Sequence, residues 1–278
     1  MTFKVSNAHP RSGFKGCVWR FFAAHSDSCA VRLLRKAVHG ALVYVHAENH
    51  DIKTNGETLV LDALGHDARA IFDVGAFRGE WTREAVARCP EARIFCFEIA
   101  TPIRDALREA MRHEPRVSVM PTGLGERTGP VTVKYYEEHP ALTSLFDFPH
   151  DVQGTWRSET VSMGDCVMAD ISCDEIDLLK MDVEGAEMPV LRGFRKALAA
   201  GAIRMIQFEY GYAAVFSHAL LRDFYEVLEP LGYVIGRLGK RGVAFAPYRL
   251  ADENFFGPNF IALRREETVL VRRLQASR

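Results

Sequence analysis

The feature that most limits the fold of this chain is an apolar run that ends in an acid and leads through a glycine-bearing turn into a helix. It spans Ile71 to Thr82, and Glu98 closes the next apolar run nineteen residues after Gly79. This pattern is typical of the front half of a nucleotide-binding β–α–β unit, in which the second acid holds the hydroxyl pair of a ribose. The sequence therefore predicts an open α/β sheet with a ligand at its edge.

Strand and helix patterns alternate along most of the chain. Strands are expected at 70–74, 93–97, 117–120, 176–181, 204–208, 233–238 and 260–263, and helices at 80–88, 102–111, 189–199 and 220–228. Such alternation indicates a Rossmann-like α/β fold with helices on both faces of an open, mostly parallel sheet. We expect about seven strands, the last of them antiparallel.

The flanking segments suggest a division into three parts. Residues 1–65 form an N-terminal helical cover, with residues 1–25 poorly ordered or loosely docked and helices at 29–47 and 57–64. The core domain follows at 66–265, and it is interrupted at about 124–174 by an insert that contains a β-hairpin. The tail, 266–278, reads as a peripheral helix.

The bulk composition excludes several classes of protein. The formal net charge of −1 gives no electrostatic reason to expect nucleic acid or a membrane as partner. The six cysteines contain no C-x-x-C pair, so they indicate neither a zinc site nor a disulfide framework. No apolar run is long enough for a membrane span or a signal peptide, which favours a cytoplasmic location; a homo-oligomer remains open.

Acidic residues stand at the carboxyl ends of four predicted strands. They are Asp73, Glu98, Asp182 with Glu184 and Glu187 close behind, and Glu209. Ligands of open α/β sheets lie at this edge, and so many carboxylates favour a cationic cofactor over the pyrophosphate of a dinucleotide. S-adenosylmethionine fits best: we expect Asp73 to face its cationic end, Glu98 to hold the ribose, and Thr82 with the following helix to receive its carboxylate. Phe77 occupies the place of the middle glycine in the dinucleotide pattern G-x-G-x-x-G.

Several further motifs resemble those of the FkbM family of S-adenosylmethionine-dependent methyltransferases. They are Asn55-Gly56-Glu57, the stretch Phe72 to Ala76, Phe97-Glu98, Thr143-Ser144-Leu145, the block Ile176 to Glu187, Leu191-Arg192-Gly193, Gln207 to Gly211 and Asn259-Phe260. The resemblance covers about residues 50–265 and implies a class I fold and O-methylation of a hydroxyl on a sugar, polyketide or similar secondary metabolite. The cofactor set that we predict is Asp73, Gly75, Phe77, Gly79, Thr82, Glu98, Ile99, Gly123 and Asp182. The family usually has Asn where this chain has Phe77.

An alcohol acceptor benefits from a general base, and the strand-end acids supply candidates. Asp182 ranks first, followed by Glu209 and Glu184. Asp182 and Glu209 could instead hold a divalent metal, which is the less favoured alternative because no third ligand is evident. Residues that could contact a small hydroxylated acceptor are His139, Ser144, Tyr210 and Tyr212. The alternatives left open are N-methylation, an NAD-dependent Rossmann oxidoreductase, and a non-catalytic protein that keeps the cofactor pocket.

Overall fold

The structure, a computed structural model, describes residues 13–45, 49–148, 152–255, 257 and 259–276. The chain divides into two compact units, Met1–Ala47 and Glu48–Arg278. The described part of the first unit contains helices α1, Gly13–Ala24, and α2, Cys29–Val45. The segment 1–25, expected to be poorly ordered or loosely docked, thus contributes a helix from Gly13 onward, and residues 1–12 lie outside the described residues.

The second unit is built on an eight-stranded sheet in the order β10-β9-β11-β8-β7-β1-β2-β3. Its strands are β1 Ala70–Val74, β2 Arg93–Phe97, β3 Val117–Val119, β7 Ile176–Met181, β8 Ile203–Glu209, β9 Tyr233–Gly239, β10 Gly242–Phe245 and β11 Asn259–Arg264. The five neighbouring strands β8, β7, β1, β2 and β3 pair in parallel. Strand β11 is antiparallel to both of its neighbours, and β10 is antiparallel to β9. The predicted α/β fold is confirmed, and β10 is the strand of this sheet that the sequence reading missed.

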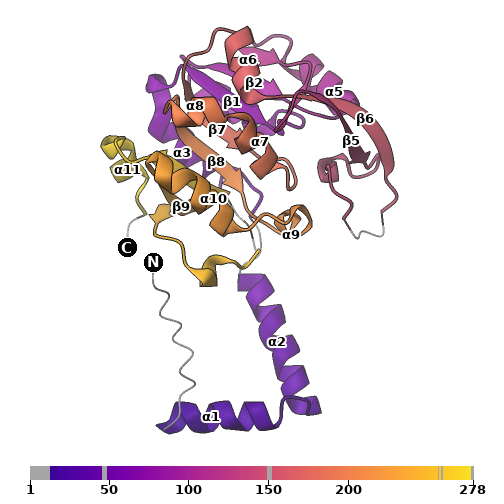
Figure 1. Cartoon of the computed structure of the whole chain (residues 1–278), viewed down its shortest axis with the longest axis vertical. Helices are drawn as coiled ribbons and strands as arrows, with labels where there is room; N and C mark the ends of the chain where they lie inside the picture. Colours follow the sequence, from indigo (N-terminus) through magenta and orange to yellow (C-terminus); the bar gives the residue numbers. More distant parts are fainter. Residues whose placement is uncertain (1–12, 46–48, 149–151, 256, 258, 277–278) are drawn as a thin grey trace. The chain divides into compact units, whose positions relative to one another are not determined.

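Helices cover both faces of this sheet because successive side chains of each strand point to opposite faces. Ile71 packs with helices α3, α4, α5 and α11, whereas Phe72 packs with α6, α7, α8 and α10. Figure 1 shows α7, α8 and α10 in front of the sheet. The helices are α3 Glu57–Leu64, α4 Glu80–Arg88, α5 Thr101–Met111, α6 Gly164–Asp170, α7 Glu187–Gly193, α8 Arg195–Ala199, α9 Ala213–Ser217, α10 Leu221–Leu228 and α11 Thr268–Leu274.

Helices α3 and α11 lie in the second unit, not in separate terminal parts. Leu61 and Leu64 of α3 are buried in the same apolar cluster as Leu270 and Leu274 of α11. The boundary between the units therefore falls at 47/48 instead of the predicted 65/66. The physical reason is burial, because α3 contributes its apolar side chains to the core of the sheet.

A second, three-stranded sheet occupies the predicted insert. Its strands are β4 Gly123–Leu124, β5 Gly129–Tyr135 and β6 Thr155–Ser162, in the order β4-β6-β5. The expected hairpin is the antiparallel pair of β5 and β6. The helix expected at 189–199 is divided into α7 and α8 at Phe194, whose ring is buried 6.1 Å from that of Phe72.

Candidate functional site

A cavity of about 460 Å³ lies at the carboxyl ends of the parallel strands β1, β2, β7 and β8. Strand ends and the loops after them supply most of its wall, and a segment of the insert supplies the rest. The lining includes Val74, Gly75, Phe77, Glu98, Ile99, Gly123, Asp182, Val183, Glu184 and Glu209 from the first group and Pro140 to Leu145 from the insert. Six of the nine predicted cofactor residues are in this lining: Gly75, Phe77, Glu98, Ile99, Gly123 and Asp182.

The turn after β1 brings two loops into backbone contact. Gly75 has φ +78°, and a Cβ atom there would lie 1.7 Å from the carbonyl oxygen of Asp182. The amide of Asp182 in turn donates to the carbonyl of Val74 over 3.0 Å. Only glycine fits this position, because any side chain would collide with backbone that cannot yield.

Phe77 shapes the middle of the same turn. It has φ +47°, an uncommon conformation for an aromatic residue, and its ring packs with Ala100, Ile103 and Tyr135. The ring therefore gives the cavity an apolar wall at the place where the resembled family usually has Asn. The backbone amide of Phe77 donates to Glu98 over 3.1 Å.

Glu98 lies at the end of β2 with both carboxylate oxygens held by backbone amides. Phe77 donates to one oxygen, and Ala100 donates to the other over 3.0 Å. Burial raises the pKa of Glu98, while these two hydrogen bonds oppose the rise. Because each oxygen retains a free lone pair and the side chain lines the cavity, Glu98 can accept hydrogen bonds from a pair of hydroxyl groups.

Asp73 does not face this cavity. Its side chain is fully buried, with Lys180 Nζ 3.0 Å from one oxygen and the Thr82 hydroxyl donating to the other over 2.7 Å. Asp73 and Lys180 are register partners on the neighbouring strands β1 and β7. The structure thus corrects two expected placements: Asp73 neutralises a buried lysine, and the Thr82 hydroxyl is committed to Asp73 and not exposed to a ligand.

Lys180 is a residue of this region that the sequence analysis did not single out. It is buried beside two buried carboxylates, Asp73 and Glu57, and one exposed carboxylate, Asp182. Burial alone would lower the pKa of its ammonium group, but Asp73, Asp182 and Glu57 together raise it. Glu57 is held nearby by hydrogen bonds of 2.6 Å from the side-chain amides of Asn55 and Gln207. The signal was present in the sequence, since a lysine inside an apolar strand calls for a buried acid opposite it.

Three carboxylates meet at the ends of β7 and β8, away from Glu98 at the end of β2. Oxygen atoms of Asp182, Glu184 and Glu209 all lie within 4.8 Å of one another. Burial raises the pKa of Glu209 well above its ordinary value, and the charges of Asp182, Glu184 and Glu187 raise it further. Lys180 Nζ lies 3.7 Å from an oxygen of Asp182. This trio can share a proton or supply oxygen ligands to a divalent cation, for which Glu184 would be the third carboxylate that the sequence did not make evident.

The insert is joined to the acidic loop through Ser144. Its hydroxyl donates to the carbonyl oxygen of Glu184 over 2.7 Å and accepts from the amide of Phe146 over 3.1 Å. Tyr212, after β8, also lines the cavity, and its ring meets that of Phe148 at 5.8 Å in an edge-on geometry. The expected acceptor contacts Ser144 and Tyr212 are therefore both at the cavity.

The other expected residues lie elsewhere. Tyr210 is buried with its hydroxyl bonded to Glu253, and His139 is exposed outside the lining. Gly79 packs beneath α5, where a Cβ atom would lie 2.2 Å from the Met111 methyl group. His50 lines the cavity although no pattern singled it out, because it is a solitary histidine in a polar loop.

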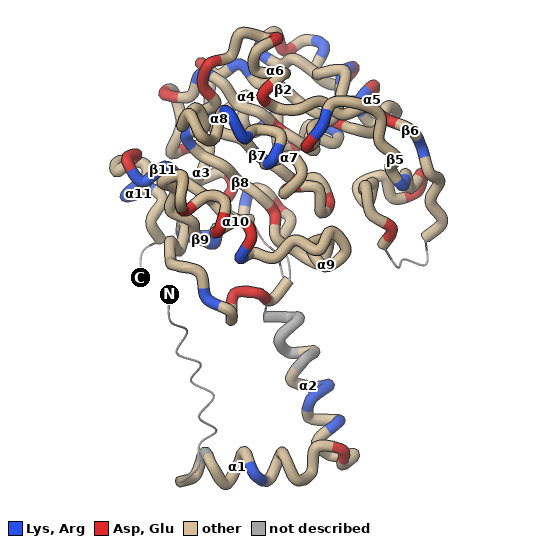
Figure 2. The backbone as a smooth tube through the Cα atoms, viewed as in Figure 1, with Lys and Arg blue, Asp and Glu red and all other residues tan. Residues whose placement is uncertain are grey.

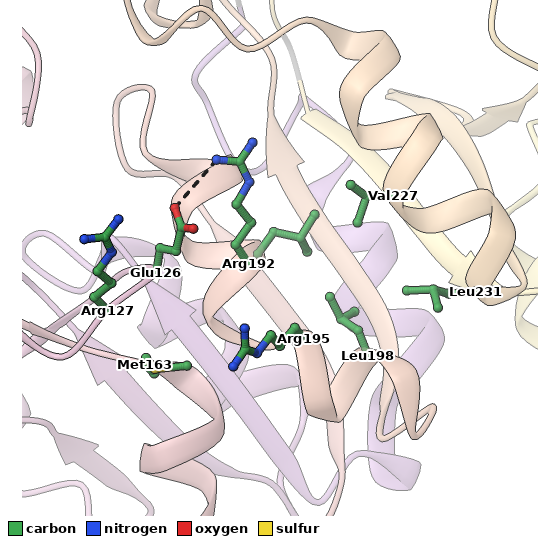
Figure 3. A pocket seen from close by; sticks show the side chains of 9 residues that line it. Glu126, Arg127, Met163, Arg192, Arg195, Leu198, Val227 and Leu231 are labelled. Atoms are coloured by element: carbon green, nitrogen blue, oxygen red, sulfur yellow. Dashed lines mark ion pairs between the residues drawn. The ribbon is translucent and has the colours of Figure 1, made fainter.

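A second cavity of about 460 Å³ lies between α7, α8, α10 and the loop after β4. Figure 3 shows Arg192 paired with Glu126 at this cavity, with Leu198, Val227 and Leu231 on the other side. It shares no lining residue with the cavity at the strand ends and contains none of the predicted site residues.

Comparison with known proteins identifies the kind of domain. The family pattern described as the methyltransferase FkbM domain matches residues 73–235, more than half of the chain. The AMB antimetabolite synthetase AmbE of Pseudomonas aeruginosa is 27% identical over 201 residues, which is 56% of this chain and 9% of the synthetase. The chain thus spans less than a tenth of the length of this curated relative.

Solved structures of methyltransferases are similar at low sequence identity. An O-methyltransferase from Bacillus cereus in complex with SAH is 12% identical, with 88% of this chain and 96% of that chain covered and a TM-score of 0.40. Fibrillarin from Aeropyrum pernix with natively bound S-adenosyl-L-methionine is 13% identical, with coverage of 74% and 73% and a TM-score of 0.41.

Proposed function

This chain belongs to the FkbM methyltransferase domain family and is an S-adenosylmethionine-dependent methyltransferase; we propose that it methylates a hydroxyl group of a sugar or secondary metabolite. The family assignment removes the NAD-dependent oxidoreductase and the non-catalytic binding protein as alternatives. The similarity to an antimetabolite synthetase supports an acceptor from secondary metabolism. N-methylation stays as the rival, and the experiment below separates the two.

The residues at one end of the strand-end cavity fit the cofactor. Glu98 offers free lone pairs to the two ribose hydroxyls, and Phe77 and Ile99 offer apolar surface beside them. The turn through Gly75 lines the cavity and has no side chain there, which would let a cofactor approach its backbone as nucleotide-binding folds require. When bound, S-adenosylmethionine supplies an electrophilic methyl group on a positively charged sulfur.

The carboxylate trio carries the proposal for a hydroxyl acceptor. An alcohol must lose its proton as the new O–C bond forms, whereas a neutral amine attacks without a base. We assign Asp182 as the general base: it would take the proton of the acceptor hydroxyl, to which the bound cofactor would supply the methyl group. Lys180 lies 3.7 Å from Asp182, and Glu209 lies at hydrogen-bond reach of it with a pKa that burial and the neighbouring carboxylates raise well above its ordinary value.

The same trio sets the test between base and metal. In the proposed mechanism the base is a carboxylate of the protein, and chelators have no effect. If Asp182, Glu184 and Glu209 instead hold a divalent cation, a chelator abolishes turnover and Mg²⁺ restores it.

The experiment measures S-adenosylhomocysteine release with matched panels of hydroxylated and amine acceptors. For the accepted substrate, Asp182→Asn should lower kcat by about 10²- to 10⁴-fold with cofactor affinity little changed, because general-base catalysis contributes about that much. Asp105→Asn, an exposed acid on α5, is the matched control and should keep full activity. Turnover of amines alone, or unchanged kcat in the Asp182 variant, would contradict the proposal.

A further inference from the structure

The charge of this chain is strongly segregated between its two units, although it sums to −1. Residues 1–47 contain seven Lys and Arg and a single acid, Asp27, which leaves a formal charge of −7 on the remainder. In Figure 2, α1 and α2 carry Lys and Arg, with an acid only at the turn between them. Segregation of this kind indicates a partner of negative charge for the basic unit.

The basic unit also exposes large apolar side chains. Phe14 of α1 is 84% exposed and Phe21 is 56% exposed, and Trp19 on the same helix is 43% exposed. On α2 the exposed apolar residues are Leu33, Leu34 and Val38. Exposed apolar groups gathered on two short helices are a feature of interaction surfaces, since single exposed residues are normally scattered.

Basic and apolar side chains lie on different faces of α2, which is the arrangement of an amphipathic helix. Arg32, Arg35 and Lys36 follow the i, i+3, i+4 spacing of one helix face, whereas Leu34 and Val38 follow an i, i+4 row on another. The helix is set by the sequence, because the Ser28 hydroxyl accepts from the amide of Val31 over 3.3 Å and so caps its start.

We propose that α1 and α2 form a peripheral anchor that binds an anionic phospholipid surface. A bilayer interface of this kind offers negative headgroups to Arg32, Arg35 and Lys36 and an apolar layer to Phe14, Trp19 and Phe21. Insertion is shallow, since no helix among the described residues has the length and apolar character of a membrane span. A second copy of the acidic catalytic unit would satisfy the charge but offers a smaller apolar surface. Among its described residues, the exposed large apolar side chains are Tyr212, Val215 and Leu220 around α9 and single residues elsewhere, such as Leu59, Trp156 and Leu250.

The test is co-sedimentation of the full chain with vesicles of phosphatidylglycerol and phosphatidylcholine, compared with phosphatidylcholine alone. We expect binding to the anionic vesicles, weaker binding as salt rises, and a blue shift of tryptophan fluorescence that Trp19→Phe removes. The triple variant Arg32→Gln, Arg35→Gln, Lys36→Gln should bind on the order of a hundredfold more weakly, because each basic residue contributes about 1 kcal/mol at such a surface.

Two controls keep the result specific. Arg127→Gln, Arg195→Gln, Arg241→Gln removes the same charge from exposed positions of the catalytic unit and should leave vesicle binding nearly unchanged. Phe14→Ser with Phe21→Ser should weaken binding without changing its salt dependence. The proposal is overturned if vesicle binding does not depend on anionic lipid, or if the control triple variant weakens binding as much as the α2 triple variant. It is also overturned if the α2 triple variant still binds vesicles but no longer self-associates in sedimentation velocity, since the basic surface would then bind a second copy of the chain.

Discussion

Two sets of carboxylates stand at neighbouring strands of one sheet and have opposite environments. Asp73 lies within β1, one residue before its end, where its strand neighbour Lys180 forms an ion pair with one carboxylate oxygen and the Thr82 hydroxyl donates to the other. Asp182 lies just beyond β7 and meets Glu184 and Glu209 with a single lysine 3.7 Å from Asp182. A carboxylate at a strand end is therefore structural or chemical according to how much positive charge is packed against it.

The buried pair gives the largest expected effect. Asp73→Asn leaves the ammonium of Lys180 buried without its closest partner, which should lower the free energy of unfolding by about 3–5 kcal/mol in a urea titration. Asp182→Asn, at an exposed carboxylate, should change it by less than about 1 kcal/mol. The double variant Asp73→Asn, Lys180→Met should recover part of the stability lost in Asp73→Asn. Equal losses in Asp73→Asn and Asp182→Asn would contradict the contrast between the two sets of carboxylates.

Replacing Glu187, a buried acid with no basic partner among the described residues, should stabilise the fold, whereas replacing Asp73 should destabilise it. Burial raises the pKa of Glu187 to about 7 from an ordinary value of 4.5, so the folded protein holds a proton that the unfolded chain has lost in that window. The contribution of Glu187 to the free energy of unfolding is fully present below pH 4.5. It is lost as pH rises to the folded-state pKa of about 7, by up to roughly 3 kcal/mol. Glu187→Gln should therefore unfold at a higher temperature than the parent at about pH 8, with little difference at about pH 4. Glu226→Gln, on the surface of α10, is the control, and parallel pH profiles of parent and Glu187 variant would refute the assignment.

Glu98 belongs to neither set, since backbone amides hold it and the cavity exposes it. Glu98→Gln removes the charge that accepts from the ribose hydroxyls, and we expect affinity for S-adenosylmethionine to fall about tenfold to a hundredfold in calorimetry. The free energy of unfolding in urea should fall by about 1–3 kcal/mol, because the new side chain keeps an acceptor for only one of the two amides of Phe77 and Ala100. An exposed acid, Glu175→Gln, serves as control; unchanged affinity in the Glu98 variant would remove this residue from the cofactor site.

Ser144 gives the smallest expected effect, because it acts only through its bond to the acidic loop. Ser144→Ala removes the hydrogen bond to the Glu184 carbonyl, worth about 1 kcal/mol, and should raise KM for the acceptor severalfold with cofactor affinity unchanged. Ser158→Ala on the exposed face of β6 is the matched control. A change in cofactor affinity in place of KM would show that the insert contributes to the cofactor end of the cavity.

The fold was predictable wherever burial imposes a clear pattern. The predicted bounds of β1, β2 and β7 agree with the structure, because each is an apolar run buried along nearly its whole length. Strand β10 was missed because it is four residues long and begins at a glycine. The division of α7 from α8 was missed as well, because the apolar spacing continues across Phe194 and the break depends on packing between distant segments.

The candidate site was predictable in position but not in orientation. The strand-end rule placed Glu98, Asp182 and Glu209 correctly at one cavity, since these residues follow from where each strand stops. The same rule misplaced the Asp73 side chain, because its direction depends on which residue of β7 lies beside it, and strand register is a property of the folded sheet. Lys180 within an apolar strand was the clue that could have shown it.

The approach of Gly75 to the Asp182 carbonyl has a mechanical consequence. With no side chain between them, the loop that would hold the methyl donor and the loop with the proposed base are in direct backbone contact, while the insert meets the second loop through the hydrogen bond from Ser144 to the Glu184 carbonyl. New acceptors can then arise by remodelling the insert without disturbing the alignment of donor and base. The chemistry and the selectivity of this enzyme are in that sense separately evolvable.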